Sequence, residues 1–144
     1  MEALLEQLPE SSFSAISSIS AALHQPYYSR MSAEHGWGLG GVYDNPWIQV
    51  DLLAVKTLVK IATRGRSTRV QWVKTYKLAY STLDEVFEYI QLSNGRDKVS
   101  KASFDSNTVI EHCLNHVLAV KVRMYPQTWQ SEYCIVFWEL FAVV

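Results

Sequence analysis

Hydrophobic and polar residues alternate in short runs along most of the chain, a pattern typical of half-buried β-strands. The clearest run is residues 73–81, where Tyr76, Leu78 and Tyr80 share one face and the intervening residues share the other. Helical periodicity is weak, and only residues 2–8 could form a turn or two before Pro9. The runs that we predict as strands are residues 13–19, 47–53, 57–63, 73–81, 88–92, 108–113, 119–125 and 135–144.

Gly, Pro, Asn, Asp and Ser separate these runs, most clearly at residues 34–41, 44–46, 93–95 and 105–107. About eight strands at this spacing predict an all-β fold, an antiparallel β-sandwich or jelly roll. The 144 residues contain no repeat or linker, so we expect a single domain, residues 1–144.

Targeting and membrane segments are not visible in the sequence. No apolar run approaches the roughly 18–20 residues that span a bilayer. The first nine residues are short, acidic and without the basic start of a signal peptide. We therefore expect the chain to be one module of a longer protein, with no transmembrane segment of its own.

Charge is distributed unevenly along the chain. The hydrophobic fraction of 49% excludes a disordered chain, and the net charge is only −1. Residues 52–83 nevertheless contain no acidic residue and carry seven basic ones: Lys56, Lys60, Arg64, Arg66, Arg69, Lys74 and Lys77. This pattern indicates a local positive field rather than a globally basic nucleic-acid-binding protein.

The cysteines and histidines do not form a metal-binding motif. Cys113 and Cys134 allow one disulfide or two free thiols, and they lack Cys-x-x-Cys spacing. His112 and His116 have i, i+4 spacing, but in a strand such residues lie about 13 Å apart. We predict no metal site, and we find no nucleophile elbow, Cys/His pair or zincin motif for catalysis.

Three motifs follow one another along the chain: Trp47-Ile-Gln-Val-Asp-Leu52, Ile61-Ala-Thr-Arg-Gly-Arg66 and Trp72-Val-Lys-Thr-Tyr-Lys-Leu-Ala-Tyr-Ser81. In these motifs and their order the chain resembles the discoidin, or coagulation factor V/VIII C-type, domain family. The resemblance implies an eight-stranded, distorted jelly-roll barrel with loops projecting at one end. Members of this family are non-catalytic, and their loops bind anionic phospholipid, sugars, collagen or receptors.

The chain departs from the family pattern at several places. The family joins its termini by a disulfide, whereas residues 2–5 and 141–144 contain no cysteine. Such a bridge would contribute about 4–5 kcal/mol, so its absence predicts lower stability or a reducing compartment. The resemblance implies an extracellular or cell-surface location, and the missing bridge leaves an intracellular one open. The first projecting loop is also shorter and lacks the paired tryptophans of lipid-binding members.

The arginines beside Gly65 are the first candidate ligand-binding residues. Guanidinium groups suit phosphate, sulfate or carboxylate recognition. The alternative is a solvated turn in which Arg66 makes a structural ion pair. Arg66 matches an arginine of the family pattern, and for it we favour the structural role. Arg64 and Arg69 are additions of this sequence, and Val70 beside them is too small to anchor a membrane alone.

Other candidates lie on neighbouring loops. Ile19, Leu23 and His24 belong to the first projecting loop. Leu39, within the glycine-rich segment 36–41, and Tyr43, just after it, could face a ligand, although this segment lacks the strand–helix context of a phosphate cradle. The adjacent Asp44 and Asn45 could supply oxygens to calcium, but two ligands do not make a site, and we predict no cofactor.

These observations predict a non-catalytic recognition (adhesion) module that binds a glycan or an anionic lipid head group through loops at one end of the barrel. Two alternatives remain open. The domain could bind a protein receptor as part of an adhesion or scaffold protein, or it could be the carbohydrate-binding appendage of a larger enzyme.

Overall fold

Two long bent strands form the centre of the fold, which is described from a computed structural model. β4 (Ile48–Arg64) has 17 residues and β8 (Ile110–Trp129) has 20. Each bends in the middle, where Leu53 and His116 have positive φ angles of 67° and 50°. The first half of β4 pairs with the second half of β8, and the second half of β4 with the first half of β8. The structure describes residues 1–82 and 85–144, so Leu83, the end of the acid-free segment, lies outside the described residues.

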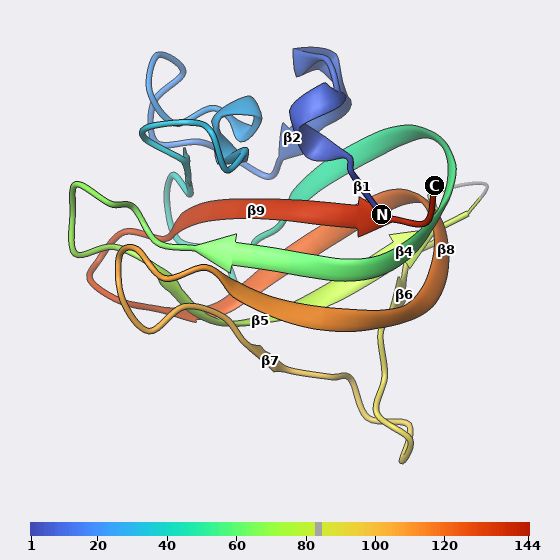
Figure 1. Ribbon diagram of the computed structural model, residues 1–144. Coiled ribbons are helices and arrows are strands. Elements are labelled where there is room, and N and C mark those ends of the chain that lie inside the picture. Colours follow the sequence, from blue (N-terminus) through green and yellow to red (C-terminus); the bar gives the residue numbers. More distant parts are fainter. Residues whose placement is uncertain (83–84) are drawn as a thin grey trace.

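Two layers result from this arrangement (Figure 1). The second half of β4 pairs with β9 (Ile135–Ala142), which in turn pairs with β1 (Glu2–Ala3). The second half of β8 pairs with β5 (Val73–Ser81), and β2 (Phe13–Ala15) pairs with the first half of β4. The remaining strands are short: β3 (Trp37–Gly38), β6 (Glu88–Tyr89) and β7 (Ser100–Lys101). The chain is therefore an all-β antiparallel sandwich, as the sequence predicts.

Several strand boundaries differ from the sequence prediction. The predicted strands 47–53 and 57–63 are one continuous strand, as are 108–113 and 119–125. Residues 13–19 and 88–92 keep only the short strands β2 and β6. Residues 2–8 form β1 and a 3₁₀ turn, η1 (Leu5–Gln7), rather than a helix. Two further 3₁₀ turns, η2 (Glu10–Ser12) and η3 (Pro26–Ser29), flank β2.

The core lies between the two layers, where the inward-facing residues of each strand meet. In β5, Tyr76 and Leu78 are buried and Tyr80 is half-buried, as their alternation predicts. β9 is buried along nearly its whole length and contributes Trp138 and Leu140. The Trp138 indole N–H donates a hydrogen bond of 2.9 Å to the Ser29 hydroxyl, so this large core side chain also has its polar atom paired.

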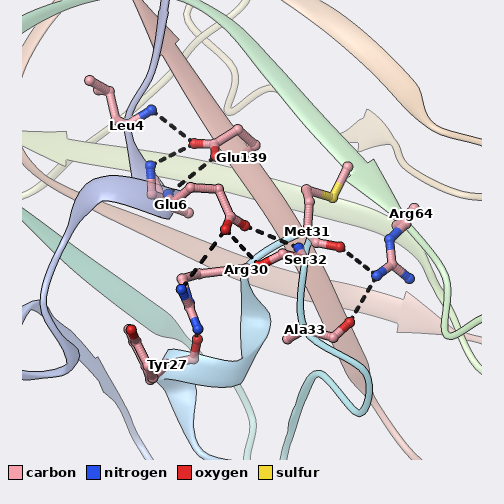
Figure 2. A network of polar contacts seen from close by, with 10 residues as sticks. Leu4, Glu6, Tyr27, Arg30, Met31, Ser32, Ala33, Arg64 and Glu139 are labelled. Carbon is pink, nitrogen blue, oxygen red and sulfur yellow. Dashed lines mark hydrogen bonds and ion pairs between the residues drawn. The ribbon is translucent and has the colours of Figure 1, made fainter.

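A buried carboxylate holds the N-terminal segment against the last strand (Figure 2). Glu139 Oε1 accepts backbone N–H bonds from Leu4 (3.1 Å), Leu5 (2.7 Å) and Leu140 (2.9 Å). Burial raises the pKa of Glu139, and the backbone N–H bonds from Leu5, Leu140 and Glu6 oppose the shift. Glu139 thus connects the two ends of the domain at the place where the family resemblance implies a disulfide.

Neither cysteine forms a disulfide within the described part of the chain: Cys113 is exposed and Cys134 is buried. Desolvation raises the pKa of the Cys134 thiol, so this side chain behaves as a small apolar group. No helix in the described residues is long and apolar enough to cross a membrane.

Candidate ligand-binding face at the loop end

Six segments meet at one end of the sandwich. We call this face the loop end, and it consists of residues 16–24, 30–36, 39–47, 65–72, 102–109 and 129–134. Hydrogen bonds join neighbouring segments: Ser106 Oγ donates to the Arg69 carbonyl (2.7 Å), and the Gln130 N–H donates to the Trp72 carbonyl (2.9 Å). A Cβ atom at Gly65 would lie 2.6 Å from the Asp105 carbonyl oxygen, so only glycine allows this approach. Loops 65–72, 102–109 and 129–134 are therefore connected to one another.

Arg64 lies at the end of β4 and binds the protein itself rather than projecting into solvent. Its guanidinium donates to the carbonyl oxygens of Met31 (2.6 Å) and Ala33 (3.0 Å), as Figure 2 shows. The guanidinium also lies 4.0 Å from the ring centre of Phe137. A further bond reaches the Gly65 carbonyl (2.8 Å). Three of its five N–H donors are thus committed to backbone carbonyls, and its contacts are those of a residue that positions loop 31–35.

Arg66 is 9% exposed and is also engaged by the protein. Its Nη1 donates to Gln71 Oε1 (3.1 Å), across the turn that joins β4 to β5, and its Nη2 lies 2.8 Å from His35 Nδ1. Burial and the nearby Arg69 lower the pKa of Arg66. An arginine can only donate, so His35 Nδ1 accepts this bond and the imidazole proton is on Nε2.

His35 is the residue through which this cluster reaches solvent. Its side chain is 33% exposed, and its Nε2 is directed away from Arg66, 3.9 Å from the carboxylate of Glu34. The backbone of the loop that carries His35 is fixed by two hydrogen bonds, which Arg64 donates to the carbonyl oxygens of Met31 and Ala33. His35 therefore presents an N–H donor of fixed orientation at the surface.

A second set of contacts fixes the same loop from the other side. The Glu6 carboxylate accepts bonds from the Ser32 backbone N–H (3.0 Å) and hydroxyl (2.6 Å), and it lies 3.9 Å from Arg30 (Figure 2). The Arg30 guanidinium stacks 3.7 Å from the ring centre of Tyr27. The hydrogen bonds of Glu139 and Glu6 thus run from β9 to the loop that carries His35.

A hollow of about 370 Å³ lies between this loop and the first projecting loop. Its wall combines charged and hydroxyl groups with aromatic rings and small aliphatic side chains. The residues that give it this character are Leu23, Tyr28, Arg30, Ser32, Glu34 and His35.

The other predicted site residues divide by exposure. Arg69 is exposed, as are Ile19, Leu23, Tyr43 and Val70. His24 and Leu39, by contrast, are 8% and 7% exposed. Leu39 packs in the core, and His24 Nδ1 lies 3.2 Å from the Gly36 carbonyl. Desolvation lowers the pKa of His24. The structure therefore gives both residues inward contacts, whereas the sequence analysis treats them as candidates for ligand contact.

Some exposed residues of the loop end were not among the sequence candidates. Val42, Phe104 and Tyr133 are 98%, 66% and 44% exposed. His35 and Phe104 each stand between turn-forming residues, in Glu34-His-Gly36 and Ser103-Phe-Asp105. In the sequence, an apolar or aromatic residue within such a turn is the signal that indicates an exposed side chain at the loop end. For calcium, Asn45 Nδ2 donates to the Tyr89 hydroxyl (3.0 Å), and no group of three metal-ligating side chains occurs among the described residues.

Comparison with known proteins identifies the domain. A family model described as the F5/8 type C domain matches residues 11–140, nearly the whole chain. The chain belongs to this family. Mouse (Mus musculus) lactadherin is 32% identical over 100 residues, which are 67% of this chain and 22% of that protein. Discoidin-2 of Dictyostelium discoideum is 32% identical over 116 residues, 80% of this chain and 43% of that protein. This F5/8 type C domain therefore spans less than half the length of these relatives.

Solved structures have the same fold. Native discoidin II of Dictyostelium discoideum aligns with a TM-score of 0.73 and 26% identity, over 92% of this chain and 55% of that chain. A family 32 carbohydrate-binding module (CpGH89CBM32-5) of Clostridium perfringens, in complex with GalNAc-β-1,3-galactose, aligns with a TM-score of 0.75 and 16% identity, over 98% of this chain and all of that chain. This second likeness shows the fold alone.

Proposed function

We propose that this F5/8 type C domain is a non-catalytic recognition module that binds a glycan in the hollow beside His35. The observation that carries the proposal is the oriented Nε2–H of His35, set among hydroxyl, carboxylate and guanidinium groups and next to Leu23 and Tyr28. Sugars present hydroxyl groups on their edges and apolar C–H faces, and a hollow that combines polar groups with apolar side chains can recognise both. An extracellular or cell-surface location is part of this proposal.

The relatives support a glycan as ligand. A structural neighbour of the same fold is a family 32 carbohydrate-binding module in complex with GalNAc-β-1,3-galactose. A carbohydrate-binding appendage of a larger enzyme would use the same site, and the sequence flanking the domain in the full protein distinguishes that case from an adhesion protein.

Replacing His35 tests the glycan proposal. We expect His35→Ala to weaken binding of a glycan identified on an array about tenfold or more, because a directed hydrogen bond in the hollow is lost. The His35→Ala substitution also removes the hydrogen-bond acceptor of the Arg66 guanidinium. His35→Asn is the matched variant, since its Oδ1 can still accept from Arg66 while the Nε2–H is absent. Isothermal titration calorimetry and thermal unfolding should show weak binding in both variants and near-normal stability in His35→Asn. A blank array, or full affinity in His35→Asn, would contradict the proposal.

A second candidate is an anionic membrane surface. Val70 and Phe104 are exposed on adjacent loops, joined by the bond from Ser106 to the Arg69 carbonyl, and Arg69 supplies positive charge. Val70 alone buries too little surface to anchor a domain, but Phe104 adds a larger apolar side chain on the same face. The apolar tips together with Arg69 are the feature that favours this alternative.

Charging those two tips tests the membrane alternative. If the loop end enters a bilayer, Val70→Asp/Phe104→Asp should reduce binding to phosphatidylserine vesicles about 100-fold, since each side chain contributes about 1.5–3 kcal/mol when buried. Val99→Asp is the control, because Val99 is comparably exposed but outside the loop end. Vesicle sedimentation with phosphatidylcholine as reference measures the effect. Equal binding by the double variant and the control would exclude insertion. A protein receptor is indicated if glycans and vesicles both fail to bind.

A further inference from the structure

A second cavity opens on the side of the sandwich. It has a volume of about 330 Å³ and lies between β5 and the first half of β8, beneath the segment of residues 90–100. In that half, β8 pairs with β4 alone among the described strands, so residues 90–100 close the gap between the two layers. No residue that lines this side cavity belongs to the loop end.

The interior of the side cavity is apolar. Ile61 and Leu78, which are core residues, contribute to it, and Ile90, Leu114 and Val117 complete the apolar wall. Cavities that hold small organic ligands have volumes of about 300–1,000 Å³ and are lined mainly by apolar side chains. The side cavity is at the small end of this range, enough for a ligand of about ten non-hydrogen atoms.

A buried hydroxyl without a partner belongs to a residue of this cavity wall. Tyr76 is 1% exposed and lines the side cavity, and its hydroxyl makes no hydrogen bond to any described residue. Its contact with Ser100 is a weak polar interaction that lacks hydrogen-bond geometry, and desolvation raises the pKa of the phenol. Buried hydroxyls are normally paired, because an unpaired one is costly. A ligand with a hydrogen-bond acceptor would satisfy this donor.

The charge at the side cavity is positive. Lys98 lines it and is half-buried, and its ammonium group has no ion-pair partner within the described residues. The nearby carboxylate of Asp97 lies 3.6 Å from the Lys77 ammonium, and Glu88, in the adjoining open groove, accepts a bond of 3.3 Å from the Tyr80 hydroxyl. His112 Nε2 is engaged with the Lys101 carbonyl. Lys98 is therefore the charge available to a ligand there.

We propose that the side cavity binds a small amphipathic carboxylate, with its apolar body against Ile61, Leu78 and Leu114 and its head group served by Tyr76 and Lys98. This site is separate from the loop end, so it goes beyond the proposed recognition function and does not depend on it. A ligand bound there would also attach residues 90–100 to the two layers of the sandwich.

Octanoate is a suitable probe for the intact domain, with octan-1-ol as the uncharged analogue. We expect saturable octanoate-induced shifts of the backbone amide signals of Ile90, Leu114 and Val117 in heteronuclear NMR spectra, with a dissociation constant of about 1 mM or tighter. Leu114→Trp, which fills the cavity, should abolish these shifts, and Val117→Trp serves the same purpose if the first variant does not fold. Shifts confined to the loop end, or unchanged binding in a folded cavity-filling variant, would overturn the proposal.

Two polar variants test the head group. Tyr76→Phe should raise the melting temperature of the free protein, because an unpaired buried hydroxyl is removed, while weakening octanoate binding about tenfold. Lys98→Ala should weaken octanoate about tenfold and leave octan-1-ol unchanged, whereas Lys74→Ala, at an exposed lysine outside the cavity, should alter neither. Unchanged octanoate affinity in both Tyr76→Phe and Lys98→Ala would overturn the assignment of the head-group position.

Discussion

Glu139→Ala is expected to lower the melting temperature of the domain by about 10 °C or more. The substitution removes the acceptor of the Leu5 and Leu140 backbone N–H groups, whereas the Leu4 N–H keeps its 2.9 Å bond to the Leu140 carbonyl. Glu139 is 3% exposed, so water does not replace the carboxylate without disrupting the core. Unpaired buried donors cost about 1–3 kcal/mol each, and we expect a total loss of about 3–4 kcal/mol. At this chain length each kcal/mol shifts the melting temperature by about 3 °C.

The effect should be specific to the hydrogen bonds of the carboxylate. Glu139→Gln keeps one oxygen for the three strong bonds and loses only the charge and the weak contact with the Glu6 N–H (3.4 Å), so about a third of the full effect is expected. Glu10→Ala, at an exposed carboxylate of the same N-terminal segment, is the control. Calorimetric unfolding of the three variants measures the series. A Glu139→Ala protein as stable as Glu10→Ala would show that the N-terminal segment contributes little to the fold.

The fold class could be predicted from the sequence because alternation in the strands is strong and turn residues separate many of them. The positions of the two bends in β4 and β8 could not be predicted from the sequence. Leu53 adopts a positive φ angle with no glycine, asparagine or proline among residues 52–55, and in the second bend the positive φ falls on His116 rather than on the neighbouring Asn115. Strand pairing resumes after each bend, whereas the hydrophobic alternation is interrupted there, so the sequence pattern divides each long strand in two. The tertiary packing of two layers, rather than local propensity, determines those conformations.

The candidate site could be predicted only as a region. The sequence places Arg64, Arg66 and Arg69 around Gly65, but their residue type does not reveal which of them binds the protein. The carbonyl partners of Arg64 belong to Met31 and Ala33, more than 30 positions earlier in the chain. His35 was missed for the same reason, because its role depends on a contact with Arg66 that only the folded chain brings together.

Arg64→Ala should separate the positioning role of this arginine from ligand contact. Two hydrogen bonds to loop carbonyls and the stacking on Phe137 are lost, and we expect a destabilisation of about 2–4 kcal/mol. Loop 31–35 would then hold His35 less firmly, so glycan affinity should fall about tenfold by an indirect route. Arg64→Lys keeps the charge but not the planar fork of donors, and it should be intermediate in both measurements.

Arg69→Ala is the matched comparison, because Arg69 is an exposed arginine of the same turn. The free energy of unfolding of the Arg69→Ala variant should change by less than about 0.5 kcal/mol, as for most surface substitutions. A change in the ligand affinity of this variant therefore reports direct charge recognition. Thermal unfolding together with titration calorimetry at two salt concentrations distinguishes the two arginines, because a direct charge contact weakens with salt and a positioning effect does not. If Arg64→Ala retained full stability but lost ligand binding with a strong salt dependence, Arg64 would be a ligand contact, and its bonds to Met31 and Ala33 would break when the ligand binds.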